Sequence, residues 1–434
     1  MNSGKFIGKR LLVLGSNIYA PEIVDYAREN GAYVFVADYY PPEKSAAKRH
    51  ADEAVDISTA DIDALKSFCL SHKIDGVFSG ISEFNILSAM QLSKELGLRF
   101  YCNKSQWDRV ERKDNFRKLC QTHKVPCPEE YYSGPSANLT EAIKSSILYP
   151  AVVKPVDCAA STGVSFCYNR DELDKAVQEA DSCSKSHSII IEQYITGYEF
   201  TVHYTICKGK VALACIDNRY PVKVHEGNVT TIPAARVYPA LFLDQYKASV
   251  NPQMISLCES LGVEFGILFA QGFYDPSNES FSIFEAGLRS AAECPCRFLE
   301  SVTGQNHIHM LVDYILTGES DYDLNLEDPD LHGKTCGIIS FTAIGGKVGR
   351  IDGLEETLSK MPNIIRFENR YPVGSIAPDG NTLRQLMLRF IMVCESREEM
   401  VKDIAYLNDH IHVYDTNGKN MVVKIVPERI LGLE

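Results

Sequence analysis

The chain has 434 residues, 45% of them hydrophobic and 23% charged, which argues against a disordered or fibrous protein. Its formal net charge is −13, so it has no overall attraction for nucleic-acid phosphates or anionic lipid. Neither a nucleic acid nor a membrane is therefore an expected partner, whereas a local basic pocket for a small anion is compatible with this charge. At about 150 residues per domain, the length predicts roughly three modules in one globular body.

The cellular compartment is predicted from the lengths of the apolar segments. No apolar run approaches the ~20 residues that cross a bilayer. The run Leu11–Leu14 ends at Gly15 and is too short for the core of a signal peptide. We therefore expect a cytoplasmic protein whose fourteen cysteines are reduced thiols. Cys258, Cys294 and Cys296 lack the paired spacing of a zinc site, so buried free thiols are their expected role.

Strands and helices alternate in the first module, residues 1–111. This alternation predicts a parallel, doubly wound sheet. The turn Gly15-Ser16-Asn17 lacks the full G-x-G-x-x-G pattern of dinucleotide sites, so we interpret the Rossmann-like domain as one wall of a site built elsewhere. The expected strands are Leu11–Gly15, Tyr33–Asp38 and Ile74–Ser79, and the expected helices are Pro21–Asn30 and Glu83–Leu96.

The middle module, residues 112–320, contains most of the candidate chemistry. A short apolar strand ends at Lys154-Pro155, and a loop of small residues from Cys158 to Gly163 follows. Backbone N–H groups can approach an anion where side chains are small, and the lysine ammonium adds a point charge. The segment therefore fits a phosphate-binding loop; a hairpin with a solvated lysine is the alternative.

A second segment, Ile189–Thr201, offers groups that suit a nucleoside. Glu192 ends an isoleucine strand, and Glu199 follows a turn at Gly197. Such a connector can present backbone groups to an adenine edge, and the second carboxylate can accept hydrogen bonds from two ribose hydroxyls. Two surface carboxylates flanking a turn are the alternative interpretation.

A third segment, Phe265–Arg289, is a predicted hairpin. Gln271 and Glu285 lie on its two arms, where a hairpin can bring two oxygen ligands side by side for a Mg²⁺ ion that bridges phosphates. Arg289 follows and could stabilise a transferring phosphoryl group. Later in this module, His307 and His309 open a predicted helix but do not share its face, so ordinary helix-start residues are expected.

The last module, residues 321–434, has short predicted strands, glycine-rich turns at Gly345-Gly346, Gly349 and Gly353, and helices near Glu355 and over Arg397–Asn408. It is expected to be a small α+β cap.

Together these segments resemble the ATP-grasp superfamily. The resemblance depends on the joint order and spacing of several loose motifs. Lys113-Asp114-Asn115-Phe116 with Val125-Pro126-Cys127-Pro128 is similar to the family's helix-and-turn, Val224–Pro233 is similar to a segment of the carbamoyl-phosphate synthetase large subunit, and Gly337–Gly353 is closer to L-amino-acid ligases and the biotin carboxylase cap.

The resemblance implies an α/β plus α+β fold: an N-terminal Rossmann-like domain, a two-subdomain ATP-grasp core with a mobile lid, and a small C-terminal α+β domain. It also implies ATP with Mg²⁺ or Mn²⁺ as cofactors. By resemblance, Lys113 and Lys154, with Ala160, Ser161 and Gly163, would hold the phosphates; Glu192, with the backbone of Tyr194 and Ile195, would face adenine; Glu199 would bind ribose; His225 would lie near ribose or phosphates; Gln271 and Glu285 would bind the metal; and Arg289 would stabilise the acyl-phosphate and its transition state.

The activity implied is that of a carboxylate–amine ligase that forms an acyl-phosphate and releases ADP and phosphate. Its partners would be small-molecule carboxylates and amines, and a homodimer is expected only by analogy. One alternative is an enzyme that phosphorylates bicarbonate. The other is a turnover-deficient ATP-binding regulatory protein, because the family's E-x-N-x-R motif has Gly287 in place of its asparagine.

Overall fold

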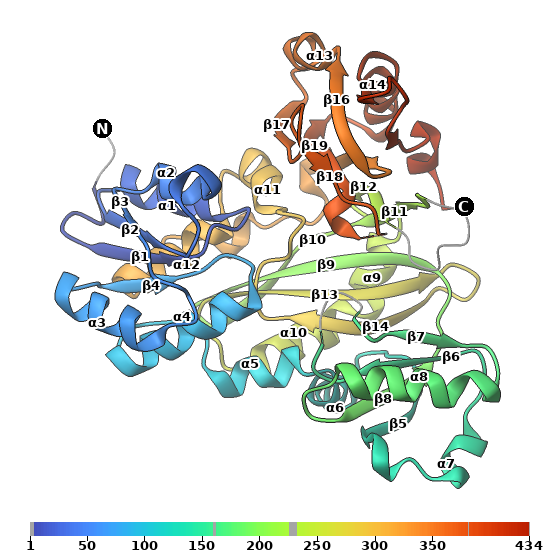
Figure 1. Ribbon diagram of the computed structural model, residues 1–434. Coiled ribbons are helices and arrows are strands. Elements are labelled where there is room, and N and C mark those ends of the chain that lie inside the picture. Colours follow the sequence, from blue (N-terminus) through green and yellow to red (C-terminus); the bar gives the residue numbers. More distant parts are fainter. Residues whose placement is uncertain (1–3, 159–161, 225–231, 381, 434) are drawn as a thin grey trace.

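The computed structural model describes residues 4–158, 162–224, 232–380 and 382–433. Figure 1 shows the N-terminal module on the left, the C-terminal module above the β10-β9-β13-β14 sheet, and the smaller β5-β8-β6-β7 sheet below it. No helix in the described ranges combines the length and the apolar character that a membrane crossing would need.

The N-terminal module contains a parallel sheet with the strand order β3-β2-β1-β4, which confirms the predicted parallel arrangement. Strands β1 and β2 each have four consecutive buried residues, as expected where both sheet faces are covered. Strand β3 was not predicted, because two of its three residues are exposed. The elements are β1 (Arg10–Leu14), α1 (Ala20–Glu29), β2 (Tyr33–Ala37), α2 (Ala46–His50), β3 (Glu53–Val55), α3 (Ile62–His72), β4 (Gly76–Phe78) and α4 (Glu83–Leu96).

Two consecutive helices lead from this module into the next. Helix α5 (Lys104–Glu111) begins with a capping box between Asn103 and Gln106. Arg112 has an extended conformation, with φ −81° and ψ 120°, and separates α5 from α6 (Lys113–His123). The break changes the chain direction between Glu111 and Lys113.

A four-stranded antiparallel sheet with the order β5-β8-β6-β7 forms the first half of the core. It has its own small hydrophobic core, to which Val153, Leu173 and Ile191 contribute. The elements are β5 (Glu130–Pro135), α7 (Glu141–Ser146), β6 (Ala151–Pro155), β7 (Ser165–Cys167), α8 (Arg170–Cys183) and β8 (Ser188–Gln193).

The second half of the core is an antiparallel sheet with the order β10-β9-β13-β14. The predicted hairpin is present as β13 and β14. The elements are β9 (Tyr198–Cys207), β10 (Lys210–Ile216), α9 (Leu243–Ser249), α10 (Asn251–Ser260), β13 (Gly266–Asp275), β14 (Ser280–Gly287), α11 (Cys296–Thr303) and α12 (His307–Thr317).

The C-terminal module is built on a sheet with the order β11-β12-β15-β19-β17. Helix α12, which precedes this module in the chain, packs against α1 and β4 of the N-terminal module. Strands β11 and β12 come from the predicted middle range yet pair in this sheet. The boundaries predicted at 111 and 320 stay a prediction. The elements are β11 (Asn218–Val222), β12 (Ile232–Tyr238), β15 (Thr335–Ala343), β16 (Gly346–Asp352), α13 (Leu354–Lys360), β17 (Ile364–Asn369), β18 (Ile376–Ala377), β19 (Leu386–Cys394), α14 (Arg397–His410), β20 (His412–Asp415) and β21 (Val422–Val423).

Candidate functional site

One face of the β9-β13-β14 sheet is polar because the sequence of β9 alternates. Phe200, Val202 and Tyr204 belong to the main hydrophobic core, whereas Thr201 and His203 alternate with them and lie on the opposite face. In register, Thr201 is opposite Gln271 of β13. The sheet therefore presents polar groups on the side away from its core.

The predicted metal ligands are neighbours on this polar face. Gln271 is directly opposite Glu285 in the β13–β14 register, and Phe269 is opposite Gly287 in the next pair on the same face. The register shifts between Gln271 and Gly272, where Phe284 is the extra residue on β14. Bulges of this kind re-aim side chains and are common beside active sites.

Arg289 follows the end of β14 and reaches the N-terminal module. Its Nη2 lies 2.8 Å from Oε1 of Glu83, the first residue of α4, and its Nε lies 3.8 Å from Oε1 of Glu111. Its guanidinium lies 4.9 Å from the centroid of the Phe269 ring. Arg289 is thus held between two carboxylates and the hairpin.

Glu111, at the end of α5, is an unusually placed carboxylate. Its Oε1 accepts a hydrogen bond of 3.0 Å from the backbone N–H of Leu288, and only 13% of the side chain is exposed. Burial raises its pKa to about 8; the charge of Arg289 opposes this rise, and those of Glu83 and Glu285 add to it.

The predicted phosphate-binding lysine lies in a buried ionic triad. Nζ of Lys154 is 2.5 Å from Oε1 of Glu192, and the guanidinium of Arg117 pairs with the other oxygen of the same carboxylate. Arg117 also donates to the carbonyl of Pro128 at 3.0 Å. Two cations therefore fix the position of Glu192, which the sequence predicts to face adenine.

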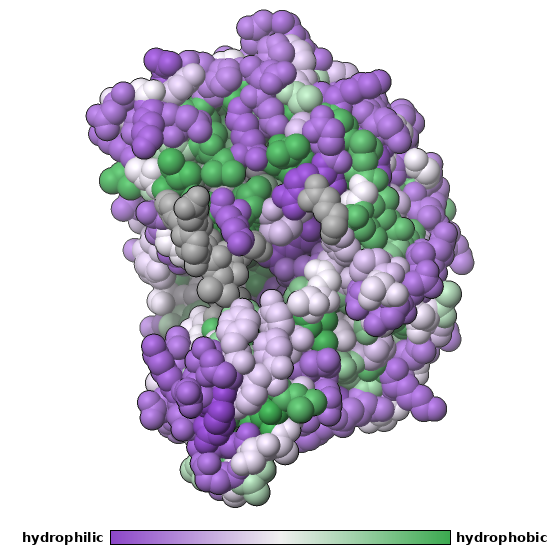
Figure 2. All heavy atoms as spheres, turned by 90° about the vertical axis from the view of Figure 1, so that its right-hand side faces the viewer, coloured by the Kyte–Doolittle hydropathy of each residue, from purple (hydrophilic) through white to green (hydrophobic). Residues whose placement is uncertain are grey.

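Lys154 also connects the two core sheets. Its Nζ lies 5.8 Å from the ring centroid of Phe284, the residue before Glu285, so a lysine of β6 stands beside the hairpin. Figure 2 shows a hollow with polar residues at its floor between the lower lobe, which holds the β5–β8 sheet, and the body above it. Lys154 and Glu285 thus belong to neighbouring walls of one region.

Lys113 lies at the base of the predicted phosphate loop. Its Nζ donates to the carbonyl of Cys158 at 2.6 Å. At the other end of the loop, Gly163 has φ +71°, and a Cβ there would lie 2.9 Å from Cβ of Cys183, so glycine is required. The predicted loop residues Ala160 and Ser161, and the predicted nucleotide contact His225, lie outside the described residues.

The predicted nucleoside contacts lie along β8, its connector and β9. Tyr194 uses its backbone N–H to donate to Pro150 at 3.3 Å, and Ile195 is half-buried in the connector. Glu199 forms an ion pair with Arg219 of β11. In the β9–β13 register, Glu199 is opposite Phe273, one pair beyond Gln271 on the same face. Their roles stay predictions.

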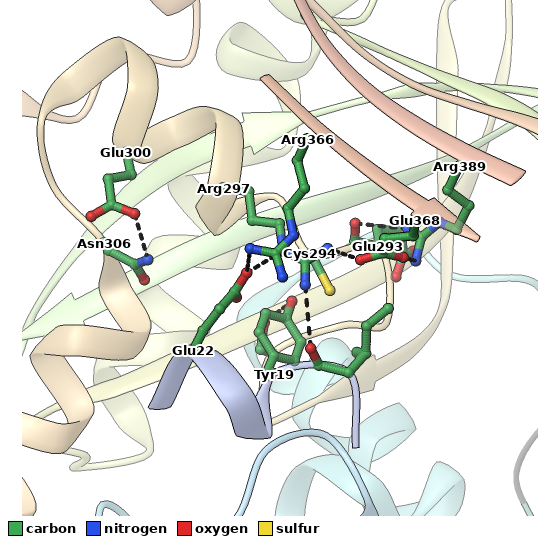
Figure 3. A network of polar contacts seen from close by, with 12 residues as sticks. Tyr19, Glu22, Glu293, Cys294, Arg297, Glu300, Asn306, Arg366, Glu368 and Arg389 are labelled. Atoms are coloured by element: carbon green, nitrogen blue, oxygen red, sulfur yellow. Dashed lines mark hydrogen bonds and ion pairs between the residues drawn. The ribbon is translucent and has the colours of Figure 1, made fainter. Parts of the chain in front are cut away.

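The segment after Arg289 is anchored by the network in Figure 3. Tyr19, from the loop before α1, has its hydroxyl 2.8 Å from Oγ of Ser290 and donates to the carbonyl of Ala291 at 2.7 Å. Arg236 of β12 lies 2.9 Å from Oε1 of Glu293. Cys294 is fully buried here, and burial raises the pKa of its thiol to about 11. These contacts leave the segment little freedom.

The hairpin fits a divalent cation held together with phosphate oxygens. Gln271 and Glu285 offer the hard oxygen donors that Mg²⁺ prefers. Within the described ranges, no three His, Cys, Asp or Glu side chains converge as a metal site. Phosphate oxygens and water would therefore have to supply most of the other ligands, as is usual for Mg²⁺.

Sequence reasoning missed three residues that the fold brings to this region. Arg117 follows Lys113 by one helical turn on α6, and this spacing was a readable signal. Glu111 precedes Lys113 by two residues, but nothing in the sequence shows that it reaches β14. Glu83 was recognised only as a helix start, because its contact with Arg289 spans 206 residues.

Known proteins match this chain over different lengths. A model of the D-ala D-ala ligase C-terminus matches residues 123–219. The carbamoyl phosphate synthase large chain of Clostridium acetobutylicum is 26% identical over 332 residues, which is 72% of this chain and 29% of that protein. A C-terminal section of the large chain from Methanopyrus kandleri is 26% identical over 202 residues, 45% of this chain and 35% of that protein. This chain thus spans about a third or less of these relatives.

Solved structures match the chain almost from end to end. The L-amino acid ligase from Bacillus licheniformis superimposes with a TM-score of 0.76 at 20% identity, covering 94% of this chain and 99% of that one. The biotin carboxylase domain of the Hydrogenobacter thermophilus 2-oxoglutarate carboxylase, solved with MgADP and bicarbonate, gives 0.76 at 16% identity, with 96% and 92% covered. The matches confirm the ATP-grasp resemblance and the α/β plus α+β fold predicted from the sequence.

Proposed function

We propose that this chain, which has the ATP-grasp fold, is an ADP-forming carboxylate–amine ligase that uses ATP with Mg²⁺ or Mn²⁺. The observation that carries the proposal is the meeting of Lys154 with the hairpin that bears Gln271 and Glu285. A lysine that can hold phosphate oxygens, next to two oxygen ligands for a divalent cation, matches what a bound nucleoside triphosphate needs.

Arg289 is the residue that we propose to assist phosphoryl transfer to the carboxylate substrate. A carboxylate is a poor electrophile, and transfer of a phosphoryl group provides it with a good leaving group. The buried guanidinium of Arg289 would stabilise the negative charge that develops on the acyl-phosphate. The site must also exclude water, which would hydrolyse the intermediate before the second substrate attacks.

The surroundings of Arg289 favour an amine as that second substrate. Glu83 and Glu111 place two carboxylates beside the guanidinium. Carboxylates attract an ammonium group and can accept its proton, whereas they repel bicarbonate. The near end-to-end match to an L-amino acid ligase agrees with this preference.

Two other functions have their own support. Bicarbonate phosphorylation is favoured by the 26% identity to carbamoyl phosphate synthase and by the biotin carboxylase match. A turnover-deficient ATP-binding protein is suggested by Gly287, which provides no side-chain ligand. A homodimer and a cytoplasmic location stay predictions.

Release of ADP with different acceptors separates the three functions. The protein, ATP and Mg²⁺ are incubated with an amino-acid mixture, with bicarbonate alone, or with neither. We expect ADP and phosphate in equal amounts only with the amino-acid mixture. ADP with bicarbonate alone would favour the second function. If ATP raises the melting temperature but no acceptor yields ADP, the protein is a binding module and the ligase proposal is wrong.

A further inference from the structure

We propose that Glu111 is a third oxygen ligand for the cation of this site and occupies the space that a side chain at position 287 would take. The inference rests on the proposed function, because it concerns the cation that would accompany the nucleotide. It assigns a role to a residue of α5 that no motif marks.

The first step is the direction in which position 287 points. In β14, Glu285 and Gly287 are two residues apart, so a side chain at 287 would lie on the same face as the Glu285 carboxylate. Gly287 has none. On the face of the hairpin that bears Gln271 and Glu285, position 287 therefore has no side-chain oxygen that could bind a metal ion.

The second step is what fills that position. A Cβ built on Gly287 would lie 2.4 Å from Cε1 of Phe269 and 3.0 Å from Oε1 of Glu111. A side chain at 287 would therefore have to displace the Phe269 ring. The Glu111 oxygen would thus be in contact with the first side-chain atom at position 287. A carboxylate from another element therefore supplies the donor that β14 lacks.

The third step is the state of that carboxylate. Glu111 is 13% exposed, and the cation nearest to it, Nε of Arg289, lies 3.8 Å away, which is too long for a hydrogen bond. The Nη2 of Arg289 is instead paired with Glu83 at 2.8 Å. Burial makes the charged form of Glu111 costly, and a divalent ion beside it would offset that cost in place of a proton.

The donor set that results suits a hard cation. Glu111 and Glu285 would contribute carboxylate oxygens and Gln271 an amide oxygen, and the phosphates and water would complete the shell. The hydrogen bond from the backbone N–H of Leu288 holds Oε1 of Glu111 in place before any ion binds. Pre-positioning of this kind lowers the cost of ordering a ligand on binding.

A purely structural role for Glu111 makes a different prediction. If the residue served only to accept the Leu288 hydrogen bond, Glu111→Gln would be silent, since glutamine keeps the acceptor oxygen and the volume while losing the charge. If it is a metal ligand, the same change removes a negative donor. The variant therefore separates the two roles.

The test measures Mn²⁺ and ADP binding to the full chain. Mn²⁺ affinity in the presence of saturating ADP is measured by electron paramagnetic resonance, and ADP affinity in EDTA by calorimetry. For Glu111→Gln we expect Mn²⁺ binding weakened tenfold or more, with ADP binding in EDTA within twofold of wild type. Glu95→Gln is the control, because it removes the carboxylate partner of Lys66 without touching Arg289 or the hairpin, and it should leave Mn²⁺ affinity within twofold.

Three results would overturn the inference. Wild-type Mn²⁺ affinity in Glu111→Gln would overturn it and leave the proposed function intact. Failure of the wild-type chain to bind ADP would overturn both. An anomalous map of wild-type crystals with Mn²⁺ and ADP tests the inference without any variant: a Glu111 oxygen within about 2.0–2.6 Å of the ion supports it, and a longer separation contradicts it.

Discussion

At the scale of single residues, the candidate site depends on charges that have more than one partner. Glu192 accepts from both Lys154 and Arg117, so loss of the lysine would still leave its carboxylate paired. Glu285 is different, because its expected role is to bind a metal rather than to hold the fold. Substitution at Glu285 can therefore be read as a test of function, and substitution at Lys154 can be read in the same way once urea unfolding shows that the variant keeps its fold.

We predict that substitution of Lys154 weakens ATP binding, whereas substitution of Glu285 abolishes turnover and leaves ATP binding unchanged. Lys154→Ala should weaken ATP binding about tenfold, because a cation beside the phosphates is lost. Glu285→Ala should leave ATP binding in EDTA within about twofold of wild type while ADP release falls below detection, because a metal ligand is lost. Binding is measured by calorimetry and turnover by ADP release. Lys334→Ala, which removes an exposed partner of Glu395, is the control. Wild-type turnover in Glu285→Ala would rule out the metal assignment.

At the scale of elements, α12 and β9 bury two histidines together. Neither ring nitrogen of His203 or His307 has a hydrogen-bond partner, and both side chains are buried. Burial, together with the smaller effects of His203 and His309, lowers the pKa of His307 to about 3. Burial likewise lowers the pKa of His203 to about 4. Both rings are therefore neutral in the folded protein at neutral pH.

These histidines predict a loss of stability in acid. The unfolded chain binds their protons near pH 6.5, whereas the folded chain resists protonation until pH 3–4. The stability that the two neutral histidines allow is thus fully present above pH 6.5. The free energy of unfolding then decreases as the pH falls toward 4. His307→Phe should reduce this loss by about 2 kcal/mol between pH 6.5 and 5 in urea unfolding. The exposed His412→Gln is the control, and an unchanged slope in His307→Phe would count against the interpretation.

At the scale of the whole molecule, one arginine joins three parts of the chain. Arg297 of α11 lies 2.7 Å from Oε1 of Glu22 on α1 and pairs with Glu368 on β17 (Figure 3). Arg389 of β19 also reaches Glu368, at 3.2 Å. The N-terminal helix, the segment after Arg289 and the C-terminal sheet are therefore locked together by one network.

We predict that Arg297→Met destabilises the molecule by about 3 kcal/mol, because removing one member of a buried ionic network leaves its partners under-compensated. Arg350→Met removes an exposed pair with Asp352, which lies at 2.7 Å, and should leave the free energy of unfolding close to that of the wild type. Both are measured by urea unfolding. Equal losses in the two variants would show that the Arg297 network does not join the modules.

Local pattern accounts for much of what could be predicted. Helix α4 starts at Glu83 and ends before Gly97, as its capping serine and left-handed glycine require. The short turn fixes the hairpin register as far as the pair Gly272 and Ile283. The register shift beyond that pair brings Gln271 opposite Glu285, and no spacing in the sequence shows this shift. The role of Glu83 was missed because its partner Arg289 is 206 residues away, beyond any periodicity.

The sequence by itself determined the elements, the ATP-grasp resemblance and most candidate ligands, since these depend on spacing within one strand, helix or turn. Only the tertiary structure decided that Glu111 lies beside Gly287, that Arg117 shares the carboxylate of Glu192, and that β11 and β12 pair with the C-terminal strands. Such contacts depend on how separately folded elements pack. Packing is set by shape and charge across the core, which no local spacing records.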